Sequence, residues 1–134
     1  MEMRDVYEYI RDEIADALGE TVFNGTMPPA EGIALMIDMG TVDTTFLTAG
    51  ISYNMGMTLN GKGKNQVEVY NKLCQAHKLL TQKKTWASGE TWQITNVSTD
   101  SMPRLLGRED NINWEYGSGL TVRFVLFNKE INSV

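Results

Sequence analysis

The chain has 134 residues, a formal net charge of −5, 42% hydrophobic residues and 22% charged residues. This length is typical of one domain, residues 1–134, and the composition is that of an ordinary globular protein. The acidic balance argues against nucleic acid as the main partner, because neutralising phosphates requires clustered lysines and arginines. It still allows a protein that stands near DNA without gripping it.

Cysteine usage and the first residues bear on the compartment. The single cysteine, Cys74, excludes a disulfide within one chain and favours a reducing compartment. Residues 1–5 are charged and are not followed by the apolar run of a signal peptide. No window reaches the apolar length of a membrane helix, so we expect no membrane partner.

Residues 3–18 carry apolar side chains at intervals of three and four, which predicts an amphipathic helix. The apolar positions are Met3, Val6, Tyr7, Ile10, Ile14, Ala17 and Leu18. Gly19 stands where a glycine commonly ends a helix. The apolar stripe must pack on another element, and the face of a sheet is the expected partner.

The next part of the chain predicts two strands and a loop. Residues 21–24 indicate a short strand, and the turn at 25–30 contains two prolines, which favours an edge or a connection. Residues 32–39 are apolar on both sides, which predicts a strand covered on both faces. Residues 40–49 predict a polar loop, in which Phe46 and Leu47 either form a contact surface or tuck into the domain.

Residues 50–82 change their period once, in the middle. Apolar and small polar residues alternate over residues 51–59, which predicts a strand with one apolar face. The sequence NGKGK at residues 60–64 is a glycine-rich turn signal. A second helix is then predicted from an apolar stripe at helical spacing. This stripe consists of Val69, Tyr70, Leu73, Ala76, His77 and Leu80. We expect the helix to pack back on the apolar face of the preceding strand.

The last third predicts two more strands. Residues 91–97 alternate, residues 99–113 form an irregular stretch with Pro103, and residues 114–127 form a long strand. The element order is therefore α-β-β-β-α-β-β with short turns. This order predicts an α+β fold, with a mainly antiparallel sheet of four to five strands and two helices packed on one face.

Residues 56–62 match the phosphate-loop pattern up to Lys62, which raises the alternative of a nucleotide-binding enzyme. Gly63 stands where that pattern needs Ser or Thr for magnesium, and the first glycine lies inside the strand alternation, so a strand-to-helix turn is favoured. His77 is the single histidine and lies on the apolar stripe, where a satisfied, partly buried side chain is the usual outcome. Neither zinc ligation nor a nucleophile made of Cys74 and His77 has a suitable spacing. We therefore expect no catalytic residue, no metal and no cofactor.

Three stretches carry a resemblance to a known family. They are DVYEYI at residues 5–10, the strand, turn and helix of residues 50–80, and PRLLGRED at residues 103–110 with NWEY at 113–116. The most specific of the three is PRLLGRED, because it precedes a last strand that contains a tryptophan. In these stretches and in element order the chain resembles the tail-terminator family of tailed bacteriophages, also called minor capsid proteins.

The resemblance implies a structural virion protein that is not an enzyme. Such a protein forms a ring, usually hexameric, at the head-proximal end of the tail. It caps the tail tube, ends tube polymerisation and meets the head–tail connector proteins, while DNA passes through without specific binding. Exposed apolar residues point to partner interfaces. The interface candidates are Phe46, Leu47, Lys62, Lys64, Met102, Arg104, Leu105, Arg108 and Glu109. The alternatives are a head-completion or connector protein, the terminator of a tail-like bacteriocin, and a monomeric binding module.

Overall fold

The computed structural model describes residues 2–46, 50–83, 86, 88–89 and 91–127. Within these residues the chain forms two helices and a five-stranded sheet. In chain order the elements are α1 (Glu2–Leu18), β1 (Val22–Asn24), β2 (Gly32–Phe46), β3 (Gly50–Gly63), α2 (Gln66–Gln82), β4 (Trp92–Glu109) and β5 (Asn113–Phe127). The strand order in the sheet is β1-β2-β3-β5-β4, and every pairing is antiparallel except the parallel pairing of β1 with β2.

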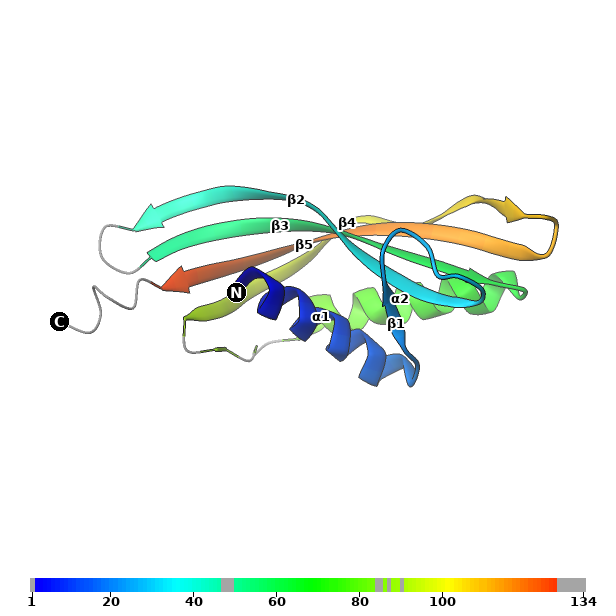
Figure 1. Ribbon diagram of the computed structural model, residues 1–134, viewed down its shortest axis with the longest axis horizontal. Coiled ribbons are helices and arrows are strands. Elements are labelled where there is room, and N and C mark those ends of the chain that lie inside the picture. The colour runs from blue at the N-terminus through cyan, green and yellow to red at the C-terminus, as the bar shows by residue number, and fades with distance from the viewer. Residues whose placement is uncertain (1, 47–49, 84–85, 87, 90, 128–134) are drawn as a thin grey trace.

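Both helices lie on one side of a long, twisted sheet (Figure 1). The predicted α+β fold, with a mainly antiparallel sheet, is therefore confirmed. The short β1 lies at the edge of the sheet, as the two prolines that follow it suggested. Neither described helix is long and apolar enough to cross a membrane.

The hydrophobic core fills the layer between the helices and the inner face of the sheet. The apolar stripes of the two helices and every second residue of the strands point into this layer. A helix repeats every 3.6 residues and a strand every 2, so each element can turn one apolar face toward the core. Burying each large side chain fully contributes about 1.5–3 kcal/mol. The largest fully buried side chains are Val6, Ile10, Ile14, Ile33, Leu35, Met57, Leu59, Leu73, Leu80, Ile94, Leu120 and Phe124.

Two glycines of β3 let α2 approach the sheet closely. A Cβ at Gly61 would lie 3.1 Å from side-chain carbons of both Ile33 and Val69, and one at Gly63 would lie 2.7 Å from Val69 Cγ2. The predicted turn at residues 60–64 is wrong for its first four residues, which continue the strand and pair with β2 and β5. The helix begins directly afterwards, where the Asn65 side chain caps it by accepting a hydrogen bond from the Glu68 amide.

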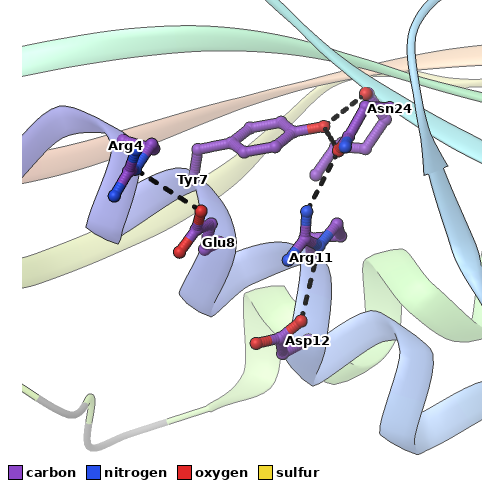
Figure 2. A network of polar contacts seen from close by, with 7 residues as sticks. Arg4, Tyr7, Glu8, Arg11, Asp12 and Asn24 are labelled. Atoms are coloured by element: carbon purple, nitrogen blue, oxygen red, sulfur yellow. Dashed lines mark hydrogen bonds and ion pairs between the residues drawn. The ribbon is translucent and has the colours of Figure 1, made fainter.

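A small polar network joins α1 to β1 and β2 (Figure 2). The Tyr7 hydroxyl lies 2.6 Å from Asn24 Oδ1 and 2.7 Å from the Leu35 carbonyl oxygen, so its one proton serves acceptors on two strands. Arg11 Nη1 also donates to Asn24 Oδ1 at 3.2 Å. Burial raises the pKa of Tyr7, and the Arg11 charge partly opposes this rise. The network fixes α1 against the edge of the sheet where β1 and β2 are paired in parallel.

Two segments predicted as irregular are strand instead. The expected loop at 40–49 is wrong up to Phe46, because β2 runs to that residue; residues 47–49 lie outside the described residues. Threonine and valine at 41, 42, 44 and 45 suit a strand, and β3 supplies the backbone partners. The expected irregular stretch at 99–113 is likewise wrong, because β4 continues to Glu109 through several register shifts. Pro103 is tolerated there because it lies at one such shift on an edge strand.

The outer face of the sheet is covered less than the sequence indicated. Both helices lie on the inner side of the sheet (Figure 1). On the outer side Ala34 of β2 is fully buried, as a strand covered on both faces requires, but Asp38 on the same side is exposed. The prediction that β2 is covered on both faces therefore holds at its first residues and fails at Asp38.

Gly63→Ala should lower the free energy of unfolding by about 1–3 kcal/mol, because its new methyl group would overlap Val69 in a packed core. Gly107→Ala is the matched control, since a Cβ there meets nothing within 4 Å. Urea unfolding followed by circular dichroism measures both. Equal effects of the two substitutions would contradict the close seat of α2 on β3.

Candidate interaction surface

Most of the candidate interface residues lie around the far part of the β4–β5 hairpin. Met102, Arg104, Leu105, Arg108 and Glu109 all belong to the second half of β4. Lys62 lies near the end of β3, and Lys64 lies in the connection to α2. The remaining two are not placed on this surface, because Leu47 and the side chain of Phe46 lie outside the described residues.

Lys62 and Glu109 form an ion pair. Lys62 Nζ lies 2.9 Å from Glu109 Oε2, and the lysine reaches across β5, which separates the two strands in the sheet. The Lys62 side chain is 4% exposed and the Glu109 side chain 43% exposed. The hydrogen bond from Lys62 lowers the pKa of Glu109, and a second hydrogen bond, from Asn113, adds to this effect. Lys62 therefore offers a partner little surface, while Glu109 stays accessible.

The neighbouring residues hold the end of the hairpin in shape. The Arg108 guanidinium lies over the Trp114 ring, 4.6 Å from its centroid, and the two residues are direct cross-strand partners. Such cation–π contacts contribute about 0.5–1 kcal/mol at exposed sites. Leu105 is paired with Tyr116, whose hydroxyl accepts a hydrogen bond from Gln66 of α2 at 2.8 Å. The candidate residues thus share one ordered hairpin end.

The acidic sequence from Glu109 to Asn113 favours a solvated turn over a calcium loop, and the structure places the turn of this hairpin there. Asp110 and Asn111 both have positive φ, 48° and 58°, and the Ile112 amide donates to the Glu109 carbonyl at 2.8 Å. Asp and Asn tolerate this left-handed backbone better than other side chains, so the adjacent pair was an available signal. The acidic residues Glu109 and Asp110 are part of this turn. Among the described residues no group of three or more His, Cys, Asp or Glu is placed to hold a metal ion.

Apolar side chains are exposed on the same hairpin. Met102, Leu105 and Leu106 are about half-exposed, and Ile112, which the sequence did not single out, is equally so. Leu106 lies over Gly117, where a Cβ would be 2.9 Å from Leu106 Cδ1. We refer to these four residues as the hairpin apolar patch. They lie on both faces of the hairpin, because Leu105 is paired with Tyr116 on the helix side and Leu106 lies over Gly117 on the outer side. Exposed apolar side chains of this kind are typical of interfaces.

His77 is buried between α2 and the sheet. It is 2% exposed, its Nδ1 lies 2.9 Å from Thr99 Oγ1, and its Nε2 is buried without a hydrogen-bond partner among the described residues. Burial lowers the pKa of His77, and the charge of Asp100 partly opposes that shift. The expected buried histidine is found, although half of its hydrogen-bonding capacity is unmet.

The structure does not contain a phosphate loop at residues 56–63. Residues 56–63 belong to β3, which is paired with β2 on one side and β5 on the other. A phosphate loop needs backbone N–H groups that are free to point at the ligand. The lysine of the pattern, Lys62, is committed to Glu109. The segment is therefore a central strand.

Comparisons with known proteins give a fold likeness. The sequence matches no protein-family model and no curated protein sequence. The fold is similar to that of a chain in the solved structure "Virion of native gene transfer agent (GTA) particle", with a TM-score of 0.55 and 13% sequence identity. The similarity covers 92% of this chain and 92% of that chain. At this identity the likeness concerns the arrangement of helices and sheet.

Glu109→Gln should lower the unfolding temperature at pH 7 more than Lys62→Met does. The first substitution leaves a buried ammonium without its partner, whereas the second removes the buried charge and leaves a half-exposed carboxylate that water solvates. Thermal unfolding of the two variants measures the difference. Equal losses would show that the ion pair itself, which both variants lack, governs this end of the hairpin, and a larger loss for Lys62→Met would contradict the cost assigned to the unpaired buried ammonium.

Stability should fall as the pH drops below about 6.5, the ordinary pKa of histidine, because the unfolded chain then takes up a proton that buried His77 refuses. The slope is at most about 1.4 kcal/mol per pH unit. His77→Gln should flatten the profile between pH 7 and pH 5. The lowered pKa values of Glu13 and Glu109 cost stability at still lower pH, below 4.5. Urea midpoints across this range test the assignment, and identical slopes for the two proteins would refute it.

Proposed function

We propose that this chain is a structural protein of a phage-like virion and forms the ring that ends the tail tube next to the head. The fold likeness to a virion chain over 92% of both chains carries the proposal, because it is independent of the short sequence motifs. The motif resemblance to tail terminators supplies the finer role. The proposed role is structural and needs no enzymatic activity and no cofactor.

Two unequal sheet edges support self-assembly. β1 covers β2 only opposite residues 33–35, so among the described residues the edge of β2 from 36 to 46 has no strand partner. At the other end of the strand order, the outer edge of β4 has none from residue 94 onward within the described chain. Open edges favour pairing with another chain. A contact between two unlike surfaces is heterologous. Repeating it produces a closed ring when the rotations between successive copies add up to a full turn.

The hairpin apolar patch is a third surface that a single copy leaves uncovered. It lies on the β4–β5 hairpin, whose turn marks one end of the molecule (Figure 1). In the proposed ring, hexameric by the family resemblance, this patch meets the next copy, the tail tube protein or the head–tail connector proteins. The net charge of −5 suits a ring through which DNA passes without being held.

Two related functions share this support. A head-completion or connector protein, or the terminator of a tail-like bacteriocin, would use the same fold and the same open surfaces. These functions differ in the target of the ring, which is the tube end for a terminator and the head connector for a completion protein. The target therefore decides between them.

Leu105→Glu should reduce ring formation, because a charge replaces an exposed apolar contact on the hairpin. Gln75→Glu adds the same charge at an exposed position of α2 and is the matched control. Light scattering and electron microscopy measure the assembly. A strict monomer at high concentration, with no ring in micrographs, would count against self-assembly away from the tail.

Purified protein added to polymerising tube subunits should shorten the tubes, and Leu105→Glu should do so less than Gln75→Glu. Tube lengths measured in micrographs report the effect. Unaltered lengths with the unsubstituted protein would remove the terminator role. Binding to the head connector in place of the tube end would then identify the completion protein.

A further inference from the structure

We propose that a hollow on the outer face of the sheet receives an arginine side chain carried by another protein chain. The hollow has a volume of about 360 Å³ and lies on the side away from the helices. Gly117 and Gly119 of β5 line it, together with Thr58 and Asn60 of β3, Asp38 of β2, and Asp100, Ser101, Arg104 and Leu106 of β4. The inference does not depend on ring formation.

The floor of the hollow exists because two residues have no side chain. A Cβ at Gly117 would lie 2.6 Å from Asn60 Oδ1, and one at Gly119 would lie 3.1 Å from Ser101 Oγ. On the inner face, Gly61 and Gly63 admit α2, whose side chains fill the space. On the outer face, no described helix covers the corresponding glycines (Figure 1). The missing side chains leave room for Asn60 Oδ1 and Leu106 over Gly117 and for Ser101 over Gly119, and these side chains shape the hollow.

The hollow holds an acceptor without a donor. Asn60 is 8% exposed, its Nδ2 donates to the Thr26 carbonyl, and its Oδ1 is buried with no hydrogen-bond partner among the described residues. The Nδ2 bond fixes the orientation of the amide, so Oδ1 is the atom above Gly117. An unmet buried acceptor costs about 1–3 kcal/mol, and a donor entering the hollow would relieve that cost.

Two carboxylates stand on opposite sides of the same hollow. Asp38 accepts from the Thr58 hydroxyl at 2.6 Å, and Asp100 accepts from the Thr121 hydroxyl at 2.6 Å. Each hydroxyl uses one of about four acceptor sites on its carboxylate. The charged residues that line the hollow are these two carboxylates and Arg104, so the lining is acidic on balance.

A guanidinium fits this arrangement better than an ammonium. Its five N–H groups in a planar fork can serve acceptors on several sides at once, whereas an ammonium is a compact point charge. The aliphatic stem of an arginine can pack along the exposed side chain of Leu106 at the rim. The positive charge of Arg104 opposes binding of a second guanidinium. Removing this charge is therefore expected to strengthen the binding.

The test titrates the folded protein with the peptide Gly-Gly-Arg-Gly-Gly, blocked at both ends, and follows amide shifts by NMR. Three matched peptides replace the arginine by citrulline, lysine or glutamate. The arginine peptide should give saturable shifts at Gly117, Gly119 and the Asn60 side chain. The lysine peptide should bind more weakly, and the citrulline and glutamate peptides should give no saturable shift there. A citrulline or lysine peptide that binds equally well, a preferred glutamate peptide, or no saturable shift with arginine would each overturn the proposal.

Three variants complete the test. The double variant Asp38→Asn with Asp100→Asn should weaken the arginine peptide by about tenfold or more, as expected for losing charge-assisted hydrogen bonds. Arg104→Ala should tighten binding, and Asp16→Asn on α1 should leave it unchanged. Dispersed amide spectra establish that each variant is folded. If Arg104→Ala weakens binding, or if the double variant binds like the unsubstituted protein, the assignment fails.

Discussion

The close seat of α2 on β3 is the contact on which the rest of the fold depends. Gly61 and Gly63 bring the helix within reach of the strand, and Val69 and Leu73 occupy the space that their missing side chains leave. The helix then provides the surface beside which α1 packs. Lys83 at the end of α2 forms an ion pair with Glu13 of α1 at 2.7 Å. The hydrogen bond between them lowers the pKa of Glu13 and raises that of Lys83, so this pair joins the two helices across a wide pH range.

The same sheet presents two chemically different faces. Its inner face is apolar and closed by helices, and its outer face carries threonine and aspartate side chains that hydrogen-bond to one another. A domain of this size usually needs one covered face for stability, and an antiparallel sheet can leave the other face to water. The outer face is thus free to be used for contact, and its hydrogen-bonded polar pairs give it a defined shape.

Regular periodicity was what made parts of this structure predictable. Both helices and the alternating portions of β3, β4 and β5 follow from spacing, because their side chains enter one apolar layer. The second halves of β2 and β4 were not predictable, because their side chains show no clean alternation. These segments are strands through backbone pairing with β3 and β5, which includes register shifts. The Lys62–Glu109 pair joins residues 47 positions apart, for which no local signal exists. The unmet oxygen of Asn60 likewise appears only when β5 lies beside β3.

The strand order also shapes how the protein folds. The two hairpins β2–β3 and β4–β5 are local, but the central pairing of β3 with β5 joins distant segments, as in the hydrogen bond from Ser118 to Leu59 across 59 positions. Closing so long a stretch costs chain entropy before any contact compensates for it, which slows folding. The helix α2 lies between these strands in sequence and packs on both in space. The sheet therefore consists of two local hairpins joined through the β3–β5 pairing, and α2 contacts strands of both hairpins.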